Sequence, residues 1–337
     1  MTAFIGRREF ITLLGGAATW PVVGPFSAYA QQSQRMPRVG LLMPYAENDP
    51  ETSPRVAALR QGLQQLGWAE GRNVRLEHYQ ADSDADSMRK LAREVVDSRP
   101  DVLLTETTPV TAAVLHETRT TPVVFVQVAD PVGSGFVTSF PHPGHNATGF
   151  NNVPLTVASK WLQLLMEIVP RTVRVMFLFH PPTAPYAQRM FESFNAAASM
   201  TGVEVVASPV HDLAELETAL AAFARVPDSG LIVFPSAFMI THRDLVATLA
   251  MRYRLPAVYA FRHYVQAGGL ISYGTIPADT YRQAATYLDR ILRGTKPADL
   301  PVQTPAKLAL IVNLKTAKAM GLTIPESFLV RADEVIE

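Results

Sequence analysis

Short apolar runs alternate with amphipathic stretches along almost the whole chain after residue 36, and this alternation most narrows the possible folds. Residues 38–43 (RVGLLM) form a nearly continuous apolar run, as expected for a strand buried on both faces of a sheet. Residues 53–66 place apolar side chains at helical spacing from Val56 to Leu66, and Gly67 follows as a C-terminal cap. Strands that alternate with helices in this way predict parallel sheets with right-handed crossovers.

The alternation occurs in two blocks, with a break near residues 148–154. In the first block we expect strands at 38–43, 73–79, 101–105 and 122–126, and helices at 53–66, 83–98 and 110–117. In the second we expect strands at 173–179, 203–207, 230–234, 256–259 and 269–273, and helices at 186–200, 213–225 and 243–253. A helix at 281–292, a proline-marked extended segment, a strand at 309–312 and a helix at 314–320 complete the chain. The predicted fold class is α/β, with two doubly wound parallel-sheet lobes.

Composition removes several classes of function. The chain has 337 residues, with 30 Lys and Arg against 30 Asp and Glu, so a nucleic-acid interface or binding to an anionic membrane surface is not indicated. There is no cysteine, which excludes disulfides, thiol catalysis and the lipid-attachment cysteine of bacterial lipoproteins. About half of the residues are hydrophobic, enough for a sizeable core in each of two domains.

The first thirty residues have the three parts of an export signal. Arg7 and Arg8 are the charged part, residues 10–23 are an apolar part too short to span a bilayer, and Ala28-Tyr29-Ala30 is a small-residue cleavage site. The arginine pair with Phe10 resembles a twin-arginine signal, and a Sec signal remains open. We therefore expect cleavage after Ala30 and a mature protein located in the periplasm without membrane insertion.

Several short motifs occur in a characteristic order along the mature chain. They are LGW at 66–68 with EGRNV at 70–74, DPV at 130–132, PGHNATG at 143–149, GGLISYG at 268–274, ILRGTKPADLPV at 291–302, NLKTAK at 313–318 and ADEVIE at 332–337. Each motif alone is weak, but their order and spacing resemble the ABC transporter substrate-binding proteins of the tryptophan/tyrosine-binding type. The resemblance covers nearly the whole mature chain.

That resemblance implies a type I periplasmic-binding-protein fold with a three-segment hinge. The crossings between lobes are then expected near 149–153, 274–277 and 298–308. The N-lobe would comprise residues 36–150 plus 277–300, and the C-lobe residues 151–276 plus 305–337. The family also implies a monomer that closes on a small molecule and delivers it to the transmembrane subunits of an ABC permease.

Ligands of open parallel sheets bind beyond the carboxyl ends of the strands, where helix N-termini also point. These positions, with the first crossing, predict the ligand-binding residues Tyr45, Thr107, Thr108, Asp130, Asn151, Phe179, Ser236, Phe238 and Tyr273. The strand-end loops contain no Lys or Arg, so backbone N–H groups and hydroxyls would hold an anionic group, while Asp130 or Glu106 would meet an ammonium. The ligand class predicted is an amino acid or a related aromatic or carboxylate metabolite.

Each of these residues has a purely structural alternative. The threonines can cap the following helix, Asp130 can begin a turn, Asn151 can satisfy hinge backbone, and the aromatic rings can pack in the core.

No catalytic constellation is visible in the sequence. The pair His142 and His145 has no third ligand nearby, so no metal site is predicted. A Gly-x-Ser-x-Gly elbow, a Walker A loop and a dinucleotide fingerprint are also missing, so no cofactor is expected. We therefore predict a non-enzymatic solute-binding protein of an ABC importer. A ligand-binding partner of a membrane sensor and an exported α/β enzyme are the alternatives.

Overall fold

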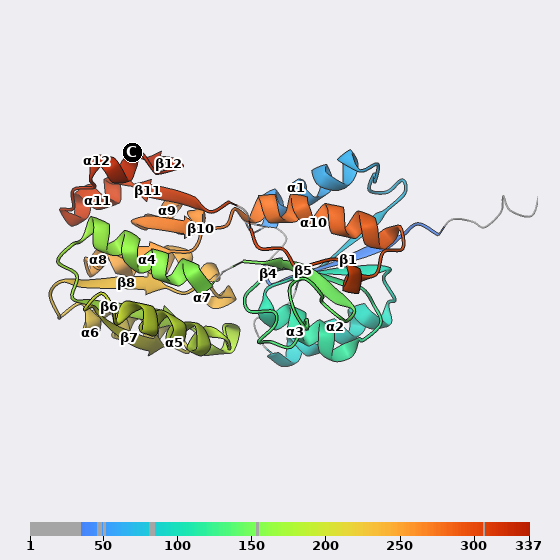
Figure 1. Ribbon diagram of the computed structural model, residues 1–337, viewed down its shortest axis with the longest axis horizontal. Helices are drawn as coiled ribbons and strands as arrows, with labels where there is room; N and C mark the ends of the chain where they lie inside the picture. Colours follow the sequence, from blue (N-terminus) through green and yellow to red (C-terminus); the bar gives the residue numbers. More distant parts are fainter. Residues whose placement is uncertain (1–34, 46–48, 50–51, 81–84, 153–154, 306) are drawn as a thin grey trace, which may run out of the picture. The chain divides into compact units, whose positions relative to one another are not determined.

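The computed structural model describes residues 35–337 except 46–48, 50–51, 81–84, 153–154 and 306 (Figure 1). The predicted export signal at residues 1–30 lies outside the described residues. In the described part of the chain, no helix is both long and apolar enough to cross a membrane.

The first sheet has five parallel strands in the order β2-β1-β3-β4-β5. The strands are β1 (Arg38–Met43), β2 (Arg75–Gln80), β3 (Val102–Glu106), β4 (Val123–Val128) and β5 (Ala147–Asn151). One face packs on α1 (Thr52–Gln65) and α10 (Pro277–Leu292), and the other on α2 (Ala85–Asp97) and α3 (Thr108–Glu117). The sheet is therefore covered on both faces, which explains why strands such as β4 are entirely buried.

The second sheet has seven strands in the order β12-β11-β10-β9-β8-β6-β7. They are β6 (Arg174–Phe179), β7 (Glu204–Pro209), β8 (Ser229–Val233), β9 (Ala257–Tyr259), β10 (Ile271–Gly274), β11 (Ala309–Asn313) and β12 (Glu334–Ile336). The helices of this half are α4 (Leu155–Ile168), α5 (Ala187–Ala198), α6 (Leu213–Phe223), α7 (Ala237–Thr241), α8 (Arg243–Arg252), α9 (Arg262–Gln266), α11 (Leu314–Met320) and α12 (Glu326–Leu329). Its core contains Trp161, whose indole N–H donates to the Tyr273 carbonyl at 2.7 Å.

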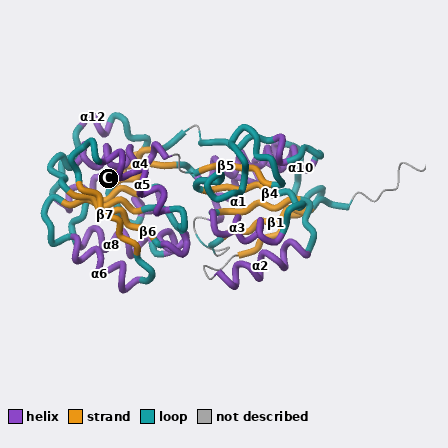
Figure 2. Tube along the Cα trace, turned by 60° about the horizontal axis from the view of Figure 1, so that its bottom comes forward, coloured by secondary structure: helices purple, strands orange, loops and turns teal. Residues whose placement is uncertain are grey.

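The chain passes between the two sheets three times. It leaves the first sheet after β5 and enters the second half at α4, returns between Gly274 and Pro277 to form α10, and leaves again after the 3-10 turn Pro297–Asp299 to form β11. Figure 2 shows the two groups of strands that these connections join. Three connections of this kind join two separately packed sheets, which is the arrangement expected for two lobes and a hinge.

Several elements differ from the predicted set. No strand or helix is predicted above for the residues of β5, α4, α7, α9, α12 and β12, and β11 runs antiparallel to β10 within an otherwise parallel set. β5 (ATGFN) has glycine and asparagine where a strand usually has branched residues, so its local signal is weak. The direction of β11 follows from its entry out of the third crossing, which is a tertiary relation without a local sequence signal.

Candidate functional site

The carboxyl ends of β3 and β4 carry unusual backbone geometry. Thr107, Gln127 and Asp130 have φ of 75°, 53° and 48°, a region that residues other than glycine rarely adopt. The register of β4 against β5 shifts between Phe125 and Val128. Phe125 pairs with Gly149 and Val128 pairs with Asn151, so three residue steps along β4 lie opposite two along β5. Such a β-bulge turns an extra residue out of the strand. Strained residues at the strand ends make this edge of the sheet a candidate for a functional site.

A pocket lies where these strand ends meet those of the second sheet. The first half contributes Tyr45, Arg55, Glu106, Thr107, Gln127 and Asn152, and the second contributes Thr183, Tyr186, Pro235, Ser236, Ala237, Ile240 and Phe261. Its volume is about 20 Å³, which is roughly the space that one water molecule needs. The lining is polar on the side of the first sheet and mixed on the side of the second.

The deepest polar feature of the pocket is an ion pair between Arg55 and Glu106. The Arg55 guanidinium donates a hydrogen bond to one carboxylate oxygen of Glu106, and the two side chains are only 3% and 1% exposed. The Tyr281 hydroxyl donates to the other carboxylate oxygen at 2.9 Å. The guanidinium carbon also lies 5.2 Å from the centroid of the Tyr45 ring. The site therefore places one positive and one negative group side by side, out of water.

Burial also raises the pKa of the tyrosines in this cluster. Removal from water raises the pKa of Tyr45, and the nearby negative charge of Glu106 raises it further. The pKa of Tyr281 is raised by the same two causes in the same order. Both phenols therefore stay protonated at neutral pH, and the Tyr281 hydroxyl can act as a donor to Glu106.

Several buried polar atoms around the pocket have no hydrogen-bond partner among the described residues. They are both amide atoms of Gln127, the hydroxyl of Thr107 and the amide oxygen of Asn152. The Gln127 and Asn152 residues are only 5% and 7% exposed. Because buried polar groups are almost always paired, such a concentration indicates a place where ordered water or a bound solute supplies the partners.

Of the nine predicted ligand-binding residues, the structure brings Tyr45, Thr107 and Ser236 together in the pocket wall. The Ser236 hydroxyl accepts from the Met239 N–H at 3.2 Å, so it also caps α7. Thr108 is buried next to the pocket, but its hydroxyl binds the backbone of Ala129. A role of these four residues in ligand binding stays a prediction.

The other five predicted residues lie outside the pocket lining. Asp130 accepts from the Gly133 N–H and from Arg189, each at 2.9 Å, so its carboxylate already has a cation. Asn151 is buried at the end of β5. Phe179 packs in the core, Phe238 stacks on an imidazole, and Tyr273 packs partly buried against the same core. The structure does not bring these five side chains into one cluster, and their binding roles also remain predictions.

Arg55 is the main residue that strand-end reasoning missed, because it lies in the first turns of α1 and not in a strand-end loop. A signal for it exists in the sequence. Arg55 precedes Leu59 by four residues and therefore shares the buried face of the helix, where an arginine needs a partner. Gln127 begins the loop after the strand predicted at 122–126 but is not among the nine predicted residues; the structure places it at the register shift of β4, with a positive φ, and in the pocket lining.

Removing the Tyr281 hydroxyl gives a first test of this network. We expect Tyr281→Phe to lower the free energy of unfolding by about 1.5–3 kcal/mol, because Glu106 loses a charge-assisted hydrogen bond inside the core. Urea denaturation followed by circular dichroism measures this change. Tyr253→Phe is the control: its hydroxyl lies on an exposed surface 3.4 Å from Glu217, and we expect a change below about 0.5 kcal/mol. Equal effects of the two substitutions would contradict a buried network around Glu106.

Comparison with known proteins identifies the family and the fold of this chain. Residues 48–336 match the family model for ABC transporter substrate binding protein. A tyrosine-binding protein of Clostridioides difficile (strain R20291) is 23% identical over 260 residues, which are 77% of this chain and 74% of that protein.

Two solved structures superpose on most of the chain. A conserved domain protein from Vibrio cholerae has a TM-score of 0.83 and 27% identity, over 89% of this chain and all of that chain. An ABC domain from Streptococcus pneumoniae in complex with L-Trp has a TM-score of 0.81 and 22% identity, over 90% of this chain and all of that chain. The two lobes of this chain have the type I periplasmic-binding-protein fold, and the chain belongs to the family of ABC transporter substrate-binding proteins.

Proposed function

We propose that this chain is a non-catalytic, exported receptor that binds a small zwitterionic solute between its two lobes. The observation that carries the proposal is the buried Arg55–Glu106 pair facing a pocket with walls from both halves of the chain. An α-amino acid presents the complementary pair of charges. Its carboxylate would bind Arg55, and its ammonium would bind Glu106 in place of that arginine contact.

The uncharged part of the lining supports an amino acid with an aromatic side chain. Tyr45, Tyr186 and Phe261 offer ring faces, while Thr107 and Gln127 offer unsatisfied hydrogen-bonding groups. A flat ring can stack on such walls without a shape-specific cavity. The similarity to a tyrosine-binding protein and to a domain solved with L-Trp agrees with this class of solute.

The mechanism that we propose is opening and closing about the three crossings. A volume of about 20 Å³ is far too small for an amino acid, so the walls must separate to admit one. Contacts from both lobes to the same solute then favour a closed form. In the proposed cycle the protein works in the periplasm after cleavage at Ala30, and the closed form is the state that docks on the permease.

A thermal-shift and calorimetric screen of the mature protein, beginning at Gln31, tests the proposal. We expect L-tryptophan, L-tyrosine or a related amino acid to raise the unfolding midpoint. At a hundredfold excess over the dissociation constant the folded state gains about 2.7 kcal/mol. A well-folded protein that gives no shift and no heat with any amino acid or aromatic carboxylate would overturn this proposal.

Analogues of a bound amino acid separate the roles of the two charges. The methyl ester removes the carboxylate, and N-acetylation removes the ammonium. We expect either change to weaken binding by at least about a hundredfold, because each leaves one buried charge without its ligand partner. An unchanged affinity of the methyl ester would contradict the role given to Arg55, and an unchanged affinity of the acetylated form would contradict that of Glu106.

A further inference from the structure

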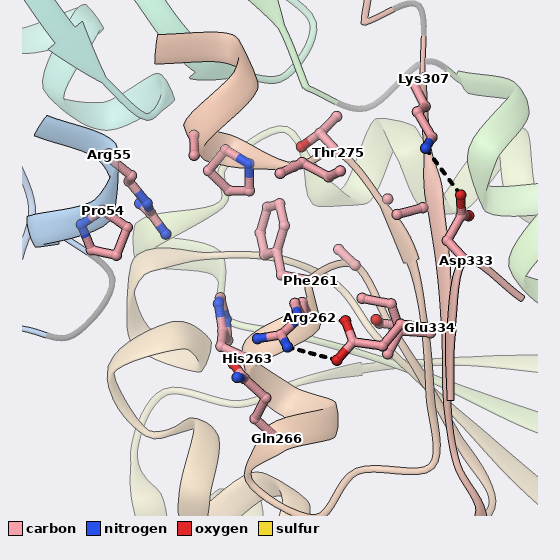
Figure 3. A pocket seen from close by; sticks show the side chains of 18 residues that line it. Pro54, Arg55, Phe261, Arg262, His263, Gln266, Thr275, Lys307, Asp333 and Glu334 are labelled. Carbon is pink, nitrogen blue, oxygen red and sulfur yellow. Dashed lines mark hydrogen bonds and ion pairs between the residues drawn. The ribbon is translucent and has the colours of Figure 1, made fainter. Parts of the chain in front are cut away.

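A second and larger cavity lies beside the crossings that join the two lobes. It has a volume of about 480 Å³, within the range of roughly 300–1,000 Å³ usual for small-molecule sites. Its walls come from the 274–278 crossing, the start of β11, the loop and helix at 260–266, and the start of α1. Figure 3 shows Phe261 among the residues that surround it, with Arg55 and Pro54 reaching it from α1.

The inner wall of this cavity combines apolar side chains with two unsatisfied hydroxyls. Phe261 and Ile311 are 5% and 4% exposed, and both line the space. The hydroxyls of Ser272 and Thr275 are buried and have no hydrogen-bond partner among the described residues. Ser272 is 1% exposed and Thr275 is 5% exposed, so bulk water does not satisfy them. A wall of this kind suits an apolar molecule that carries at least one hydrogen-bonding group.

The charged residues at the rim are already neutralised in pairs. Arg262 makes two hydrogen bonds of 2.7 and 2.6 Å to the Glu334 carboxylate, and Lys307 lies 3.1 Å from Asp333 (Figure 3). The Leu310 N–H, and after it Lys307, holds the pKa of the Asp333 carboxyl below its usual range, and the hydrogen bonds from Arg262 do the same for Glu334. Because each of these rim charges already has a partner of opposite sign, the two pairs present no excess charge to attract a charged ligand, and the rim favours a neutral one.

We infer that this hinge cavity, defined by Phe261, Ser272, Thr275, Ala309 and Ile311, is a second binding site for a neutral, largely apolar small molecule with a hydroxyl or similar polar group. It is distinct from the polar pocket, although Arg55 and Phe261 line both spaces. A substitution of Arg55 or Phe261 would alter both spaces at once. The residues substituted in the test below therefore line only one of the two spaces.

Phenol and toluene are suitable probes, because they share a shape and differ in one hydroxyl. Ligand-observed NMR titration of the mature protein measures the two affinities. We expect both probes to bind at a single site and phenol to bind about fivefold more tightly, which corresponds to one neutral hydrogen bond. Thr275→Val together with Ser272→Ala removes both hydroxyls at nearly constant volume, and should abolish the preference for phenol without loss of toluene binding.

Two further variants locate the site. Ala309→Leu fills the cavity from the start of β11 and should reduce the affinity of both probes by more than tenfold, while Ser236→Ala, in the polar pocket, should leave both unchanged. Thermal unfolding of each variant confirms that it folds. Absence of binding to the wild type would overturn the inference. So would loss of binding in Ser236→Ala with retention in Ala309→Leu, because that result would assign the probes to the polar pocket. Neither result depends on the solute of the polar pocket.

Discussion

Replacement of Arg55 by methionine is expected to lower the free energy of unfolding by about 3–5 kcal/mol and to abolish binding of an amino acid. The stability loss follows because Glu106, at 1% exposure, is left as a buried charge without its cation. Binding fails because the substitution removes the only cationic side chain in the described lining of the polar pocket. Urea denaturation and calorimetric titration measure the two effects separately.

The double substitution Arg55→Met with Glu106→Gln separates two contributions to the stability loss: the unpaired buried charge of Glu106 and the lost packing of the Arg55 side chain. Glutamine keeps the shape of Glu106 and can still accept from the Tyr281 hydroxyl, so we expect recovery of at least half of the lost stability without recovery of binding. Arg60→Met is the matched control on the same helix, where the side chain is 49% exposed and pairs with Glu70. It should change stability by less than about 1 kcal/mol. A loss below 1 kcal/mol for Arg55→Met itself would show that the buried pair is not important for the fold.

The second large effect is expected for Gly149→Ala, with a loss of about 3 kcal/mol or more in the free energy of unfolding. A Cβ at this position would lie 2.0 Å from the Phe125 carbonyl oxygen, and the φ of 155° is itself unfavourable for alanine. The clash is with backbone, so it can be relieved only if β4 and β5 move apart. Because this pairing holds the bulge that turns Gln127 toward the pocket, we also expect weaker solute binding.

Gly67→Ala is the control that measures the cost of a positive φ for alanine without a steric clash. Gly67 has a φ of 90° and no atom within 4 Å of its ideal Cβ, so substitution costs only the left-handed conformation, about 1 kcal/mol. The difference between the two variants in urea denaturation then reports the steric term at Gly149. Similar losses for both variants would mean that the β4–β5 contact yields easily and that the bulge is not held by this glycine.

Much of the fold could be predicted from local patterns. The apolar run at 38–43 and the helical periodicity at 281–292 are strong local signals, and the structure has β1 and α10 there within a few residues. Local patterns failed at β5, where glycine and asparagine obscure a buried strand. They located β11 correctly but did not give its antiparallel direction, which depends on the third crossing. In both cases the deciding interaction lies with a strand distant in the sequence, which a local window does not contain.

The candidate site also divides into features that local sequence predicts and features that tertiary packing decides, for the same physical reason. The amino-acid sequence by itself determined the two α/β lobes and the edge of each sheet where a ligand can bind, because hydrophobic periodicity and strand–helix order are local properties. Only the tertiary structure decided which side chains meet there. It paired Arg55 of α1 with Glu106 of β3, bound Tyr281 of α10 to the same carboxylate, and paired Asp130 with Arg189. These partners are separated by 51, 175 and 59 residues, and such pairings are set by packing of whole elements and not by any local preference.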